Sequence, residues 1–95
     1  MALREELAAS VDEARWEWMR AHLERGGLIV VAADLDLAWA GERVAADDAA
    51  TVGGWIESGK LAKPSTEQIA AWDAASDKRF RMLIVSPYIL VQEME

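Results

Sequence analysis

The side chains best suited to acid–base, nucleophilic or metal chemistry are scarce in this chain. Its 95 residues contain a single histidine, His22, and no cysteine. The lack of cysteine excludes a thiolate nucleophile and a sulfur-ligated zinc site, and one histidine cannot form a multi-histidine metal site. No Gly-x-Ser-x-Gly motif accompanies His22. A hydrolase triad would therefore have a candidate base but no motif that presents a nucleophilic serine. We therefore interpret His22 as a boundary residue on a helix, assign no catalytic residue, and favour a function other than catalysis.

Acidic side chains are abundant and occur in four closely spaced sets: Glu5-Glu6, Asp12-Glu13, Asp34 with Asp36, and Asp47-Asp48. Two carboxylates at such a spacing can contribute oxygen ligands to a hard cation, but calcium loops need more oxygen ligands in sequence than occur here. Each set also falls at an expected helix start, where the positive end of the helix dipole stabilises negative charge. We therefore predict helix capping at these positions, with no metal site and no cofactor.

The segment from Val44 to Leu61 resembles a helix-turn-helix with Asp47-Asp48 at the turn. Its Gly-Lys-Leu exit into a short strand is similar to that of excisionase-like DNA-binding domains. A recognition helix needs Arg, Lys, Asn or Gln on its outer face to contact bases and phosphates. The second helix here offers acidic, hydroxyl and glycine residues instead. Nucleic-acid binding therefore stays an alternative that the residue types disfavour, and a structural helical corner is the preferred interpretation.

The charge and hydropathy of the whole chain limit its partners further. Seventeen acidic residues against ten basic ones give a formal net charge of −7, which repels nucleic acid and anionic membranes. The longest apolar run, Leu28 to Ala33, is far shorter than the roughly 20 residues of a membrane span. The N-terminal residues, Met1 to Glu6, resemble neither a signal peptide nor a transit peptide. We expect a cytoplasmic protein with no membrane contact.

Five tryptophans in 95 residues are the most unusual feature of the composition. Trp18, Trp55 and Trp72 fall on the apolar stripes of expected helices, so we predict that they are buried in the core. Val52 and Ile56 share the stripe of Trp55, and we expect the three to form one buried helix face. Because tryptophan is also enriched in protein interfaces, the tryptophans that lie off these stripes are candidates for a partner contact.

Trp16 and Trp39 are the two tryptophans off the main apolar stripes of their helices. Trp16 lies about 160° from Trp18 at 100° per residue, and it forms a second stripe with Met19 and Leu23. Trp39 lies roughly opposite the apolar stripe of its own helix. A helix that is apolar on two sides is covered on both, either by the same chain or by a partner. We take Trp16, Met19, Leu23 and Trp39 as the candidate surface for a protein partner or for self-association, with packing within the chain as the alternative.

Capping boxes and stop signals predict the order of the elements that carry these residues. Ser10 with Glu13 predicts the start of a helix from Val11 to about Glu24, and Ser65 with Gln68 predicts a later start. The other expected elements are helices at 3–9, 37–46, 49–58 and 66–75, a short extended piece at 60–63, and strands at 28–32 and 80–85. Residues 88–92 are expected to form a further strand or a bent continuation of the strand before them, with an edge, a bulge or a turn at Pro87. This order predicts a single small α+β domain over residues 1–95, with one three- or four-stranded sheet covered by about four to five helices.

Segments spread over almost the whole chain resemble one protein family. They are Leu28 to Val31, the Asp47-Asp48 corner with Val52 and Trp55-Ile56, Leu61 to Pro64, Gln68-Ile69 with Trp72, Arg79-Phe80, and Leu83 to Glu93. Together they are similar to a family of small bacterial proteins catalogued as domain of unknown function 2288. The resemblance implies a single-domain bacterial protein. It brings no activity, cofactor or substrate with it, so no functional residue is carried over.

The leading hypothesis is a non-enzymatic module that binds another protein or itself. It follows from the surplus of large apolar side chains off the main stripes, together with the lack of a catalytic frame. The first alternative is a nucleic-acid binder that uses the Asp47-Asp48 corner with nearby basic side chains such as Lys60, Lys63 and Arg79.

The second alternative is a ligand-binding protein or a small enzyme. Such a function requires a concave pocket with convergent polar groups. We expect that pocket among Trp55, Trp72, Tyr88 and the ends of the strands. The polar members available to it are Tyr88, His22 and Asp47.

Overall fold

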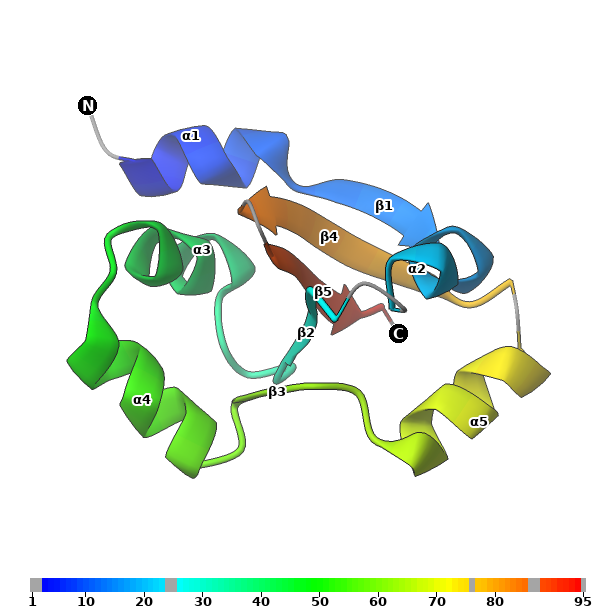
Figure 1. The fold of residues 1–95 in the computed structure, drawn as a ribbon. Coiled ribbons are helices and arrows are strands. Elements are labelled where there is room, and N and C mark those ends of the chain that lie inside the picture. The colour runs from blue at the N-terminus through cyan, green and yellow to red at the C-terminus, as the bar shows by residue number, and fades with distance from the viewer. Residues whose placement is uncertain (1–2, 24–25, 76, 86–87, 95) are drawn as a thin grey trace.

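A five-stranded mixed β-sheet with helices on both faces forms the framework of the protein (Figure 1). The computed structural model describes residues 3–23, 26–75, 77–85 and 88–94. In chain order the elements are α1 (Leu3–Ser10), β1 (Asp12–Arg15), α2 (Trp16–Leu23), β2 (Leu28–Val31), α3 (Leu37–Ala45), α4 (Ala49–Glu57), β3 (Leu61–Ala62), α5 (Thr66–Ala74), β4 (Arg79–Val85) and β5 (Tyr88–Glu93). The strand order is β1-β4-β5-β2-β3, in which β2 and β5 are parallel and the other neighbours antiparallel. The α+β class is confirmed, whereas the prediction of three or four strands is wrong.

The additional strand is β1, which occupies residues where we expected the first turn of a helix. Asp12 to Arg15 pair antiparallel with Met82 to Arg79 of β4. The Ser10 hydroxyl donates to a carbonyl within α1 at 3.1 Å, so the predicted capping box with Glu13 is wrong. Pairing with β4 supplies the backbone partners that a first helical turn leaves unsatisfied. Helix α2 therefore begins only at Trp16.

Alternation of side chains along the strands divides the core into two clusters, one on each face of the sheet. On one face Leu83 and Leu90, which are register partners, lie under α1 and α3. On the other face Met82 and Val91, also register partners, lie under α2 and α5. The buried members are Val31, Leu35, Leu37, Ala40, Leu61, Leu83 and Leu90 in the first cluster, and Trp16, Met19, Leu28, Trp72, Phe80 and Val91 in the second. The continuously apolar β2 is covered on both faces, as its sequence predicted.

Burial on α2 is the reverse of the expectation. Trp16 and Met19 are 0% exposed, whereas Trp18 is 45% exposed and stacks on His22 with ring centroids 4.4 Å apart. Periodicity gives the angle between two side chains on a helix but not the side that faces the sheet. Here the junction with β1 turns Trp16 inward. The prediction of a buried Trp72 is confirmed at 3% exposure, and that of a buried Trp18 is wrong.

Several local predictions are confirmed by hydrogen bonds. The Asp48 carboxylate caps α4 by accepting from the N–H of Thr51 at 3.2 Å. Ser65 and Gln68 form both bonds of the predicted capping box at α5. Gly59, with a φ of 80°, ends α4 in the left-handed region that favours glycine. Two expected boundaries lie outside the described residues: Glu24 and Pro87.

Candidate interaction groove

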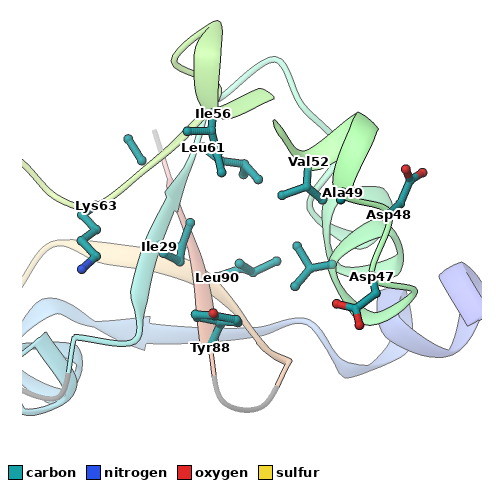
Figure 2. Close-up of a pocket in the computed structure, with 12 residues that line it drawn as sticks. Ile29, Asp47, Asp48, Ala49, Val52, Ile56, Leu61, Lys63, Tyr88 and Leu90 are labelled. Atoms are coloured by element: carbon teal, nitrogen blue, oxygen red, sulfur yellow. The ribbon is translucent and has the colours of Figure 1, made fainter. Parts of the chain in front are cut away.

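An apolar groove of about 490 Å³ lies between α4 and the sheet (Figure 2). We call it the α4 groove. Its apolar and aromatic lining includes Ile29, Val52, Ile56, Leu61, Tyr88 and Leu90, and its charged lining comprises Asp47, Asp48 and Lys63. The groove is therefore built by α4, by Val44 at the end of α3, and by the three strands β2, β3 and β5.

Strand register builds the sheet side of the groove. Ile29 and Leu90 are partners in the parallel β2–β5 pair. Tyr88 precedes Leu90 by two residues, so its side chain lies on the same face of β5. Leu61 enters from β3, where it pairs with Val31. The alternation that builds the core thus also builds the groove floor.

Helix α4 forms the opposite wall, although it buries none of its own residues. Val52 and Ile56 are four residues apart and share one side of the helix; Val52 is half-buried, and Ile56 is 59% exposed. Trp55 packs edge-on against Trp39 of α3, with ring centroids 5.2 Å apart. The packing of Trp55 holds α4 to the molecule, and the side with Val52 and Ile56 stays open toward the groove.

Opposite charges stand at the two ends of the groove (Figure 2). Asp47 and Asp48 lie at the start of α4, and Lys63 follows β3. Hydrogen bonds from Thr51 and then from Arg43, whose Nη1 is 3.1 Å from the carboxylate, hold the pKa of Asp48 below its ordinary value. Asp47 has a φ of 57°, a left-handed conformation that aspartate adopts more readily than most residues. One end of the groove is therefore negative and the other positive.

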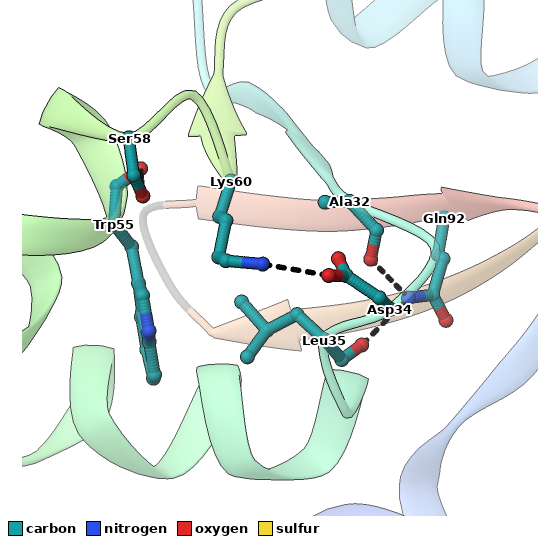
Figure 3. A network of polar contacts seen from close by, with 7 residues as sticks. All are labelled: Ala32, Asp34, Leu35, Trp55, Ser58, Lys60 and Gln92. Atoms are coloured by element: carbon teal, nitrogen blue, oxygen red, sulfur yellow. Dashed lines mark hydrogen bonds and ion pairs between the residues drawn. The ribbon is translucent and has the colours of Figure 1, made fainter.

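The side chains of Gln92 and Lys60 hold the loop between β2 and α3 (Figure 3). The Gln92 side chain, only 5% exposed, donates through Nε2 to the carbonyl oxygens of Ala32 and Leu35, both at 2.7 Å. Lys60 Nζ donates to Asp34 at 2.7 Å, and this contact lowers the pKa of the Asp34 carboxyl. The predicted capping role of Asp34 is wrong, because its carboxylate holds the loop to the segment before β3. Asp36 occupies the N-cap position of α3, but its side chain makes no capping hydrogen bond, so its predicted capping bond is also wrong. These contacts position α3, which in turn holds α4.

Three of the four residues that we expected on an interaction surface lie inside or against the core. Trp16 and Met19 are fully buried, and Leu23 packs against the same cluster. The Trp16 indole N–H donates to Asp73 at 2.8 Å. Trp39 is 37% exposed and belongs to α3, which covers the opposite face of the sheet. The four residues therefore do not form one surface. Trp16 and Met19 pack within the chain, which was the alternative interpretation.

The chain matches the model of a protein family over residues 2–93, and that family is described as a protein of unknown function, DUF2288. The chain belongs to the DUF2288 family. The fold is similar to the NMR solution structure of PA1075 from Pseudomonas aeruginosa, with 26% sequence identity and a TM-score of 0.83 over 98% of this chain and 85% of that one. No curated protein matches the chain. The family resemblance seen in the sequence is confirmed, and the comparisons attach no activity to it.

In this DUF2288 protein the residues expected to line a ligand pocket are dispersed. Tyr88 and Asp47 line the α4 groove, whereas Trp72 lies in the core cluster beneath the other face of the sheet, and His22 stacks on Trp18. Among the described residues, no three His, Cys, Asp or Glu side chains are grouped closely enough to hold a metal ion. None of the helices in the described ranges is long and apolar enough to cross a membrane.

Ile56 is a groove residue whose side chain is exposed rather than buried in the core. We expected it to be buried with Val52 and Trp55, but Val52 and Trp55 are only half-buried and Ile56 is 59% exposed, so the prediction of a buried helix face is wrong. Adjacent residues on a helix lie about 100° apart, so a short helix that packs on one side cannot bury both Trp55 and Ile56. The adjacent pair Trp55-Ile56 was the signal that one of the two would be exposed.

Proposed function

We propose that this DUF2288 protein is a non-enzymatic interaction module that binds another protein, or a second copy of itself, through the α4 groove. The observation that carries the proposal is the exposure of the Ile56 side chain. This side chain is 59% exposed on a helix that buries none of its residues. Tyr88, at 42% exposure, adds an aromatic ring to the same groove.

The chemistry of the groove suits the centre of a protein interface. Removing apolar surface from water stabilises a complex by about 25 cal/mol per Å², and tyrosine is enriched among the residues that dominate binding energy. Asp47 and Lys63 add charged groups of the kind found at an interface rim. Grooves beside a helix accept the apolar side of a partner segment.

A nucleic-acid interface has less support from the same residues. Helix α4, the expected recognition helix, contains no lysine or arginine between Ala49 and Glu57. Lys60 is already paired with Asp34 at 2.7 Å. Bases and phosphates would therefore meet few free donors on this side of the molecule.

A selection from displayed random peptides tests the proposal, with Ile56→Asp as the groove variant. Ile84→Asp is the matched control, because Ile84 is 55% exposed on β4 and does not line the groove. We expect selected peptides to be apolar, to bind wild type and Ile84→Asp equally, and to bind Ile56→Asp at least about tenfold more weakly. Peptides that bind Ile56→Asp as well as wild type would contradict the proposal. So would a complete lack of selected peptides in a protein that also does not self-associate.

A small apolar ligand is a second candidate occupant, favoured by the volume of the groove. About 490 Å³ falls within the range of roughly 300–1,000 Å³ that is common for small-molecule sites. The Tyr88 hydroxyl and the Asp47 carboxylate are the polar groups available to orient such a molecule. Fluorescence of an anilinonaphthalene dye tests this candidate: enhancement by wild type and Ile84→Asp but not by Ile56→Asp supports it, and equal enhancement by all three contradicts it.

A further inference from the structure

We infer that the occupant of the α4 groove is a second copy of this chain, related to the first by a two-fold axis through the groove. The inference rests on the proposed function and adds the identity of the partner. It is carried by the charges along the groove rather than by the apolar floor. The carboxylates of Asp47 and Asp48 stand at one end, and the ammonium group of Lys63 stands at the other (Figure 2).

Opposite charges at the two ends make the groove complementary to itself. In a two-fold interface, each contact between two residue positions occurs twice, with the copies exchanged. When two grooves meet in opposite directions, Asp47 lies near the partner subunit's Lys63, and Lys63 lies near the partner subunit's Asp47. A groove with the same sign of charge at both ends would repel its own copy.

The two charges that this arrangement needs are available. In the part of the chain that the structure describes, neither Asp47 nor Lys63 takes part in an ion pair. Other charges nearby are already engaged, since Asp48 binds Arg43 at 3.1 Å and Lys60 binds Asp34 at 2.7 Å. A second copy therefore gives Asp47 and Lys63 the ion-pair partners that the described residues of their own chain do not.

The side of α4 next to the groove is also open to a close approach. Gly53 precedes Ile56 by three residues, so both lie on one side of the helix. A Cβ atom built at Gly53 would meet no heavy atom within 4 Å. Because Gly53 carries no side chain, the backbone of α4 is accessible to a second copy at that position. In the two-fold arrangement, each Ile56 side chain covers the groove of the other copy.

Because the whole chain carries a large negative charge, the interface is better tested by changing the charges of Asp47 and Lys63 than by changing the salt concentration. Each copy carries −7, so two copies repel one another at long range, and salt screens that repulsion. The pairs between Asp47 and the partner subunit's Lys63 act only at contact. Exchanging the two charges therefore isolates the interface, whereas changing the salt concentration alters both effects together.

Sedimentation equilibrium of the full chain tests the inference through charge exchange. Wild type is expected to form a dimer reversibly. Asp47→Lys and Lys63→Asp are each expected to raise the dimer dissociation constant by about tenfold, because two attractive pairs become two repulsive ones. An equimolar mixture of the two variants, and the double variant Asp47→Lys/Lys63→Asp, are both expected to restore wild-type association.

Milder substitutions guard against loss of folding at these positions. Asp47→Asn keeps a residue that tolerates the left-handed backbone, and Lys63→Gln removes charge without reversing it. Circular dichroism confirms that each variant is folded, and these two are expected to weaken the dimer less than the charge reversals do.

Two outcomes overturn the inference: a wild type that stays monomeric at millimolar concentration, or single variants whose defects neither the mixture nor the double variant restores. A monomeric wild type that still selects peptides sensitive to Ile56→Asp overturns only the second copy as partner. Peptides indifferent to Ile56→Asp in a monomeric protein overturn the proposed function as well.

Discussion

The indole Nε1 of Trp16 donates a hydrogen bond of 2.8 Å to Oδ1 of Asp73 and so joins α2 to α5. Trp16 is fully buried, and a buried indole N–H requires an acceptor. Arg20 Nε donates to the same oxygen at 2.7 Å, and its Nη2 donates to the other carboxylate oxygen at 3.2 Å. A surface ion pair therefore holds the acceptor in place for a core side chain.

Replacement of Trp16 is expected to be far more costly than replacement of Trp18. Trp16→Ala removes a ring that packs on Trp72 and Phe80, with ring centroids 4.9 Å and 6.0 Å apart. We therefore expect the free energy of unfolding to fall by about 3–5 kcal/mol. Trp18→Ala, at a position with 45% exposure, is expected to cost less than about 1 kcal/mol. Urea denaturation measures both. Equal losses would contradict this orientation of α2, and a larger loss in Trp18→Ala would show that its other side faces the core.

Acid is expected to destabilise the protein through Asp73. Its pKa is held below the ordinary 3.8, first by the Arg20 hydrogen bond and then by that of Trp16. A carboxyl whose pKa is lower in the folded state contributes stability that is fully present above the unfolded pKa and lost as pH falls through the folded value. The melting temperature should therefore decrease below about pH 4, and Asp73→Asn should make that decrease shallower. An unchanged acid profile in Asp73→Asn would contradict this role.

Two glycines in neighbouring helices are expected to respond oppositely to alanine. A Cβ at Gly41 of α3 would lie 2.5 Å from Cδ2 of Leu83, which is fully buried, so Gly41→Ala is expected to destabilise the fold by about 1–3 kcal/mol. At Gly54 of α4 no atom lies within 4 Å, so Gly54→Ala is expected to stabilise it by about 0.5–1 kcal/mol. Urea midpoints of dilute samples compare the pair, and a tolerated Gly41→Ala would show that the contact between α3 and β4 is loose.

Loss of the Gln92 amide is expected to weaken the loop that positions α3. Gln92→Leu keeps the approximate volume but removes the donor to the carbonyl oxygens of Ala32 and Leu35, at a cost of about 1–3 kcal/mol. Amide hydrogen exchange should rise in the segment from Ala32 to Leu37 more than in α5. Protection that stays unchanged there would mean that Lys60 and Asp34 hold the loop without Gln92.

Much of the fold could be predicted because its signals are local. The cap at Asp48, the capping box of Ser65 and Gln68, and the stop at Gly59 each depend on residues within one turn of each other. The apolar run of β2 likewise predicts a strand covered on both faces. These interactions exist as soon as the segment adopts its own backbone conformation.

The arrangement of the segments depended on contacts between residues distant in the chain. Asp12 to Arg15 form a strand only because Arg79 to Met82 lie beside them; their own composition suits a helix equally well. The same pairing turns Trp16 inward and Trp18 outward, a choice that helical periodicity leaves open. The exposure of Ile56 arises in the same way, since packing of α4 through Trp55 leaves its other side uncovered. Sequence alone therefore determined the elements and ends that have local signals, such as β2, α4 and α5. Only the tertiary structure decided that β1 is a strand and which side of each helix is buried, because strand pairing and burial depend on surfaces that other segments supply.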